Sequence, residues 1–151
     1  MDGLEDFIVE AKAASYAGNG AFQAPSRGGS HDIGYRREAW RYLDSYFGGT
    51  DFLGQETAWL GEVPVWAMNY YGRILRSKLI DAVVAGSVIK AALSALYREG
   101  RFLGGFEHEV GPARYVDASS GTVEGFHGVE RIFIGASEAY RLDYHGGLVR
   151  P

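Results

Sequence analysis

Seven polar or aromatic side chains are spaced so that they could line a binding site. They are Glu56, Asn69, Tyr71, Glu130, Asp143, His145 and Tyr42. The two glutamates would supply negative charge, and the tyrosines would supply stacking surfaces. Asn69, Asp143 and His145 would supply hydrogen bonds. A cleft of this composition suits a small organic ligand that is cationic or carries hydroxyl groups.

The spacing of these residues indicates an internal repeat. The segment GQETAWLGEVPVWAMNYYGRIL, residues 54–75, aligns without gaps with GVERIFIGASEAYRLDYHGGLV, residues 128–149. The identical positions are Gly54/Gly128, Glu56/Glu130, Gly61/Gly135, Tyr70/Tyr144 and Gly72/Gly146. The sequence therefore predicts a single domain, residues 1–151, built from two repeat units at about residues 1–75 and 76–151.

A β-hairpin is predicted in the first repeat unit. Gly61 stands at the first central position of a two-residue type II′ turn, where a positive φ is required. This turn places Leu60 opposite Val63 and Glu56 opposite Ala67. Because side chains alternate along a strand, Glu56 then shares a sheet face with Asn69 and Tyr71.

The second repeat unit gives the same hairpin. The turn at Gly135 places Glu130 opposite Arg141 as a cross-strand ion pair, on the face of Asp143 and His145. In both units the glutamates are expected to point away from the helices and into a recess shared by the two units. The competing interpretation is that this face is polar because it meets water.

Hydrophobic periodicity predicts the order helix, three strands, helix, three strands. One helix begins near Leu4 and ends before Gly18, and the second lies between Ser77 and Gly100. The predicted strands lie within residues 40–71 and at 113–118, 126–134 and 137–145, with loops at 18–34 and 100–112. The expected fold class is α+β, in which two pseudo-symmetric helix-plus-three-strand repeats form an antiparallel sheet with the helices packed on one face.

The composition excludes several function classes. A formal net charge of −4 leaves no basic excess for binding nucleic acid or an anionic membrane surface. The absence of cysteine excludes a disulfide, a thiolate nucleophile and a cysteine-ligated zinc. The start of the chain, MDGLEDF, lacks the features of a secretion signal, so a cytoplasmic location is expected.

Two other functions remain open at this level. Glu56 or His145 could act as the acid or base of a small enzyme, although the sequence offers no nucleophile. The mixed polar and aromatic face could instead be an interaction surface, for a homodimer or for a regulatory protein partner.

No metal or cofactor is expected. Glu107, His108 and Glu109 lack a second histidine or a distant ligand, so a solvated loop is the preferred interpretation. Asp44 and Asp117 stand in the matching segments RYLD and RYVD, where they could join the cleft or hold a turn.

Five segments carry a resemblance to a known family. EAKAASYAG, SRGGSHD, YLDSYFGGTDFLGQE, VWAMNYYGRIL and YHGGLV resemble an uncharacterised bacterial domain family found alone or C-terminal to an XRE-type helix-turn-helix in predicted transcriptional regulators. The likeness spans nearly the whole chain. It implies a sensory domain in a regulatory context, and it assigns no catalytic residues. Since the predicted first helix begins close to Met1, regulation would require a DNA-binding partner.

Overall fold

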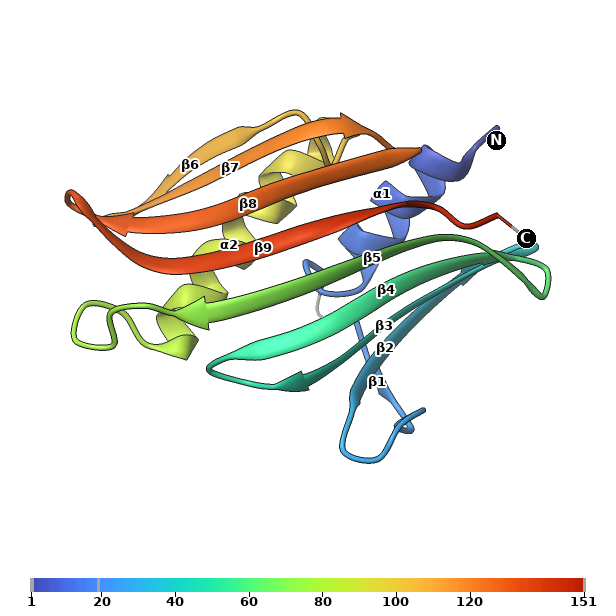
Figure 1. Cartoon of the computed structure of the whole chain (residues 1–151), viewed down its shortest axis with the longest axis horizontal. Helices are drawn as coiled ribbons and strands as arrows, with labels where there is room; N and C mark the ends of the chain where they lie inside the picture. The colour runs from blue at the N-terminus through green and yellow to red at the C-terminus, as the bar shows by residue number, and fades with distance from the viewer. Residues whose placement is uncertain (1, 19, 151) are drawn as a thin grey trace.

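A single antiparallel sheet contains all the strands of the described chain, which comprises residues 2–18 and 20–150 of the computed structural model (Figure 1). The strands are β1 (Phe22–Gln23), β2 (His31–Arg37), β3 (Trp40–Gly48), β4 (Phe52–Leu60), β5 (Val63–Ile74), β6 (Phe106–Val110), β7 (Ala113–Thr122), β8 (Gly125–Ile134) and β9 (Ser137–Leu148). Their spatial order is β1-β2-β3-β4-β5-β9-β8-β7-β6. The two halves of the chain therefore meet at the centre of the sheet, where β5 pairs with β9.

Two helices complete the fold, α1 (Leu4–Ala14) and α2 (Ala82–Arg98). The side chain of Asp81 begins α2 by accepting a hydrogen bond from the Val84 amide at 2.8 Å. The main strand contacts of α1 are with β2 and β3, whereas those of α2 are with β6 and β7. The helices also contact each other, and Figure 1 shows both behind the sheet. Each helix thus packs mainly near one end of the sheet.

The predicted fold class is wrong. The described chain is mostly strand and forms one nine-stranded sheet with two helices, not two helix-plus-three-strand repeat units. The prediction missed three strands, because β1 and the start of β2 lie in the expected loop 18–34, and β6 lies in the expected loop 100–112. These segments are strands because they pair along the edges of the sheet, a tertiary effect that local composition does not report.

The predicted register is correct at the first hairpin turn and wrong further along the strands. Leu60 does lie opposite Val63, but a β-bulge between Ala58 and Trp59 shifts the register by one residue. Glu56 consequently lies opposite Met68 instead of Ala67. Since side chains alternate along a strand, the shift moves Glu56 to the face that carries the core.

The second hairpin contains the same irregularity. A bulge between Ile132 and Phe133 places Glu130 opposite Leu142, so the predicted ion pair with Arg141 does not form. Arg141 instead donates two hydrogen bonds to Asp143 on the other face, each 2.8 Å long. Both glutamates therefore point inward, contrary to the expectation that they would point away from the helices.

The core is one cluster of buried side chains from the strands and both helices. It is rich in aromatic residues, and Trp66, Tyr115 and Tyr140 are among its largest fully buried members. In the part of the chain described, neither helix is long and apolar enough to cross a membrane.

The SRGGSHD segment, residues 26–32, forms the end of the β1–β2 loop and the start of β2, and it is tied to β3. Asp32 accepts hydrogen bonds from the Ser26 amide at 2.8 Å and from the hydroxyls of Ser30 and Ser45 at 2.7 Å. Burial raises the pKa of Asp32, but these hydrogen bonds together outweigh burial and lower it to about 2. The segment therefore has a clear structural role.

Candidate functional site

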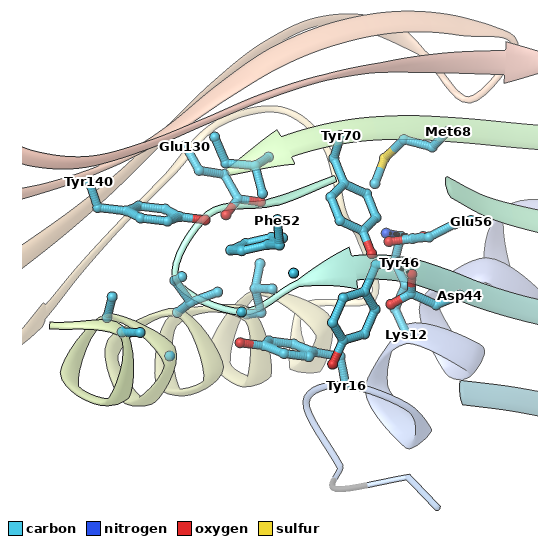
Figure 2. Close-up of a pocket in the computed structure, with 18 of the residues that line it drawn as sticks. Lys12, Tyr16, Asp44, Tyr46, Phe52, Glu56, Met68, Tyr70, Glu130 and Tyr140 are labelled. Atoms are coloured by element: carbon cyan, nitrogen blue, oxygen red, sulfur yellow. Dashed lines mark hydrogen bonds and ion pairs between the residues drawn. The ribbon is translucent and has the colours of Figure 1, made fainter. Parts of the chain in front are cut away.

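A cavity of about 260 Å³ lies between strands of both halves of the sheet and the two helices (Figure 2). Its lining residues are Lys12, Tyr16, Tyr42, Asp44, Tyr46, Gly48, Gly49, Thr50, Phe52, Glu56, Met68, Tyr70, Ile74, Ala82, Ala85, Gly86, Ile89, Leu93, Tyr97, Glu130, Tyr140 and Leu142. The exposed members of this set, Tyr16 and residues 48–50, mark its opening. The remaining walls are mainly aromatic and aliphatic.

One end of the cavity contains a buried ion pair. The Lys12 ammonium, carried by α1, lies 2.5 Å from Oε2 of Glu56 on β4, and both side chains are less than one-tenth exposed. Asp44 occupies the position directly opposite Glu56 on β3, and its Oδ1 accepts a hydrogen bond from the Tyr70 hydroxyl at 2.5 Å. Figure 2 shows these four side chains grouped together.

The protonation of Asp44 is set by its surroundings. Burial is the main cause that raises its pKa to about 7, and the neighbouring Glu56 carboxylate adds to the rise. The hydrogen bond from Tyr70 and the charge of Lys12 oppose it. Asp44 can therefore gain or lose a proton near neutral pH, which is the property required of a general acid or base.

The other end of the cavity carries Glu130 on β8. Burial raises the pKa of Glu130 from 4.5 to about 8, Asp117 adds to the rise, and Lys12 and Tyr115 oppose it. Glu130 is partly exposed, but it lines the cavity, where protein atoms surround it. Its carboxyl group is therefore mostly neutral at pH 7 when no cation is present.

Beside Glu130, the cavity contains a polar group that lacks a partner. Tyr140 is 1% exposed, and its hydroxyl has no hydrogen-bond partner within the described residues. Leaving a buried hydroxyl unpaired costs about 1–3 kcal/mol. A bound molecule that hydrogen-bonds to Tyr140 would remove this cost.

Most tyrosines of the cavity are hydrogen-bond donors at any ordinary pH. Burial is the first cause that raises the pKa of Tyr42, Tyr70 and Tyr97, and nearby carboxylates raise it further. These phenols stay protonated, so they offer hydroxyl groups and ring faces to a ligand. None of them is set up to act as a phenolate base.

The structure separates the seven predicted site residues into two groups. Glu56, Glu130 and Tyr42 line the cavity. The other four are Asn69, Tyr71, Asp143 and His145, which lie together on the opposite, exposed face, where Asn69 pairs with His145 and Tyr71 with Asp143 across β5 and β9. The two bulges account for this division. They place each glutamate on the sheet face opposite to that of the candidate residues on the second strand of its hairpin.

Sequence analysis missed several lining residues. Lys12 could have been found, because it follows Phe7, Ile8 and Ala11 on the apolar side of the first helix, where a lysine needs a buried partner. Asp44 was considered for the cleft and does line it. Tyr140 carries no comparable signal, since only the packed structure leaves its hydroxyl unpaired.

The Glu107, His108 and Glu109 segment is part of edge strand β6 instead of the expected loop. The described residues contain no group of three or more histidine, aspartate or glutamate side chains arranged to hold a metal ion.

Comparison with known proteins gives one match. No curated protein and no solved structure matches the chain. Residues 44–149 match DUF5680, a domain of unknown function, and this region includes strands β4–β9 and α2. It therefore contains most of the cavity, although Lys12, Tyr16 and Tyr42 lie before it. Because the match covers more than half of the sequence, the chain belongs to the DUF5680 domain family.

Proposed function

We propose that this chain is a small-molecule binding domain whose ligand occupies the cavity between the two halves of the sheet. The observation that carries the proposal is the unpaired hydroxyl of Tyr140 in a cavity that also presents Asp44 and Glu130. Small-molecule sites typically combine apolar walls with a few convergent polar groups, and they measure roughly 300–1,000 Å³. A cavity of about 260 Å³ lies slightly below that range, so it suits a small ligand.

The sequence of α2 supports this proposal. Gly86 lies in the interior of the helix, where glycine is less stable than alanine by about 1 kcal/mol. A Cβ atom at this position would meet only the Tyr16 hydroxyl, at 4.0 Å. The missing side chain therefore keeps part of the cavity open, at a cost to helix stability.

A thermal-shift screen against a library of metabolites tests the proposal. A ligand at 100 times its Kd adds about 2.7 kcal/mol to the free energy of unfolding, which corresponds to a shift of several degrees in Tm. Gly86→Leu should remove the shift, because the new side chain fills the cavity. Ser87→Leu is the matched control, since Ser87 is exposed on the same helix and does not line the cavity. A shift that survives Gly86→Leu would place the ligand elsewhere and contradict the proposal.

A second candidate function is acid–base catalysis on the bound molecule. Asp44 and Glu130 favour it, because both carboxyl groups have a pKa near neutrality and face one cavity. His145, the alternative base considered from sequence, lies on the opposite face of the sheet. Incubating each ligand from the screen with the protein, and following it by NMR, should reveal turnover that Asp44→Asn abolishes. Unchanged ligands would favour binding alone.

The resemblance to domains of XRE-type regulators gives this binding a cellular context. We propose that the chain is a cytoplasmic bacterial sensor, in which ligand binding changes the affinity for a DNA-binding partner. The experiment is a pull-down from bacterial lysate with and without the ligand found in the screen. Partners that do not depend on the ligand would weaken the sensory role, but they would leave the binding proposal intact.

A further inference from the structure

The two glutamates of the cavity differ in their partners. Glu56 binds the Lys12 ammonium at 2.5 Å, whereas Glu130 has no ion pair in the part of the chain that the structure describes. Otherwise the two residues are placed alike. Each lies directly opposite an aspartate on the neighbouring strand, Asp44 for Glu56 and Asp117 for Glu130.

We propose that Glu130 binds the ammonium group of an organic cation, while the apolar part of the same molecule fills the cavity. The inference rests on the proposed binding function and specifies its ligand class. Lys12 provides the precedent within this cavity, because it shows how a glutamate in this position is neutralised by an ammonium group. The Lys12 ammonium is paired with Glu56, and no ion pair joins it to Glu130 in the described part of the chain.

The surroundings of Glu130 fit an ammonium group. An alkylammonium has three N–H donors, and the Tyr140 hydroxyl oxygen is an unpaired acceptor in the same cavity. The rings of Phe52 and Tyr140 are stacked with their centroids 6.5 Å apart. Figure 2 shows Phe52 lying between the Glu130 end of the cavity and the Lys12 end. Aromatic ring faces attract cations within about 6 Å, so an ammonium group held this close to either ring would gain a cation–π contribution in addition to the attraction of the carboxylate.

The composition of the lining favours a cationic ligand over an anionic one. Three carboxyl groups line the cavity, from Asp44, Glu56 and Glu130, against the single ammonium of Lys12. An anionic ligand would compete with Glu56 for Lys12, and it would oppose ionisation of Asp44 and Glu130. A cation instead stabilises the ionised form of Glu130, which is otherwise costly to bury.

Three probes of nearly equal shape test the inference, namely 2-phenylethylamine, 2-phenylethanol and 3-phenylpropionate. They present a cation, a neutral hydroxyl and an anion on the same aromatic body, and calorimetry at pH 7 would give their Kd values. We expect the amine to bind at least tenfold more tightly than the alcohol, and the carboxylate to bind most weakly. Glu130→Gln should abolish the preference for the amine, whereas Glu130→Asp, which keeps the charge, should retain part of it.

Two further variants complete the experiment. Tyr140→Phe should weaken binding of the amine several-fold more than binding of the alcohol, if its hydroxyl accepts from the ammonium. Glu62→Gln is the matched control, because Glu62 is exposed in the β4–β5 turn. Unfolding temperatures of all variants would confirm that loss of binding does not reflect loss of the fold.

The outcomes separate the two proposals. If the alcohol or the carboxylate binds as tightly as the amine, or if Glu130→Gln keeps the preference, the cation inference is wrong and the binding function stands. If the amine binds equally well when Gly86→Leu fills the cavity, the site lies elsewhere and both proposals are wrong. Failure of all three probes to bind at millimolar concentration would also count against both.

Discussion

The two halves of the sheet contain the same arrangement of carboxyl and tyrosine side chains. In β3–β5 the Tyr70 hydroxyl donates to Asp44 at 2.5 Å, and in β7–β9 the Tyr144 hydroxyl donates to Asp117 at 2.7 Å. Each tyrosine side chain lies over a glycine on the strand between its own strand and that of the aspartate. A Cβ atom added to that glycine would lie 2.5 Å or less from the tyrosine ring or its hydroxyl. The matching residues thus have matching geometry.

The halves differ in what the helices add to them. α1 supplies Lys12, which neutralises Glu56, whereas α2 contributes small and apolar side chains and the phenol of Tyr97 to the cavity. As a result Glu56 belongs to an ion pair, while burial leaves Glu130 mostly protonated near neutral pH. Similar backbone positions therefore have different surroundings: Glu56 is fixed in an ion pair, and Glu130 is the residue that we propose binds a ligand.

Removing Lys12 should produce the largest effect. Lys12→Met leaves Glu56 buried without a counter-ion, so we expect a loss of about 3–5 kcal/mol in the free energy of unfolding at pH 7. The double variant Lys12→Met/Glu56→Gln should recover most of this loss, because no buried charge remains. Urea denaturation of the four members of this cycle measures both effects. If the loss in the double variant equals the sum of the two single losses, the pair is not coupled.

Glu130 should have the opposite influence on stability. Its pKa is higher in the folded protein, about 8, than the ordinary value of 4.5, so the folded state keeps a proton that the unfolded chain releases. The stabilising contribution is complete below about pH 4.5 and is lost as the pH rises to about 8.

Glu130→Gln removes this dependence on pH. Relative to the native chain, we expect the variant to gain roughly 2–3 kcal/mol between pH 5 and pH 8, a figure reduced from the full linkage value because Glu130 keeps some accessible surface. Denaturation curves at several pH values give the comparison. Parallel profiles for the two proteins would show that Glu130 ionises normally.

The two tyrosine–carboxyl pairs should have similar strengths. Tyr70→Phe and Tyr144→Phe each remove one donor from a buried aspartate, and each should cost about 1–3 kcal/mol. Tyr70→Phe should also raise the pKa of Asp44 further, because the Tyr70 hydrogen bond lowers it in the native chain. Denaturation and NMR titration measure the two effects. A large cost for only one tyrosine would break the equivalence of the halves.

Substitutions on the outer face of the sheet should have the smallest effect. Asp143→Asn weakens an exposed hydrogen-bonded ion pair with Arg141, and it should change the free energy of unfolding by less than about 1 kcal/mol. Ligand shifts found in the thermal screen should remain within error. A loss of ligand binding in Asp143→Asn would return this face to consideration as the site.

Part of the fold could be predicted from local sequence patterns. Both helices and the two central hairpins were expected, and the pairing of Leu60 with Val63 follows from glycine at the turn. Strands β1 and β6 were not expected, because an edge strand is specified largely by its neighbour and carries a weak pattern of its own. For the same reason the extent of the sheet was underestimated.

The candidate site was predicted only in part. Glu56, Glu130 and Tyr42 do line a shared cavity, but the reasoning that selected the glutamates placed them on the wrong face of the sheet. One extra residue in each hairpin, at the bulges near Trp59 and Phe133, reverses every side chain beyond it. A bulge depends on how neighbouring strands twist and pack, so alternation in the sequence alone did not reveal it.

The sequence by itself determined which side chains recur in the two halves, since Gly54, Glu56 and Tyr70 have counterparts at fixed spacing. It also determined where the central chain turns, because glycine alone readily adopts the positive φ found at Gly61 and Gly135. Only the tertiary structure decided that Lys12 reaches Glu56 and that, among residues 2–18 and 20–150, no ion pair forms with Glu130. Ionisation of a buried carboxyl group depends on which charges and how much water surround it, and folding brings those surroundings together from distant parts of the chain.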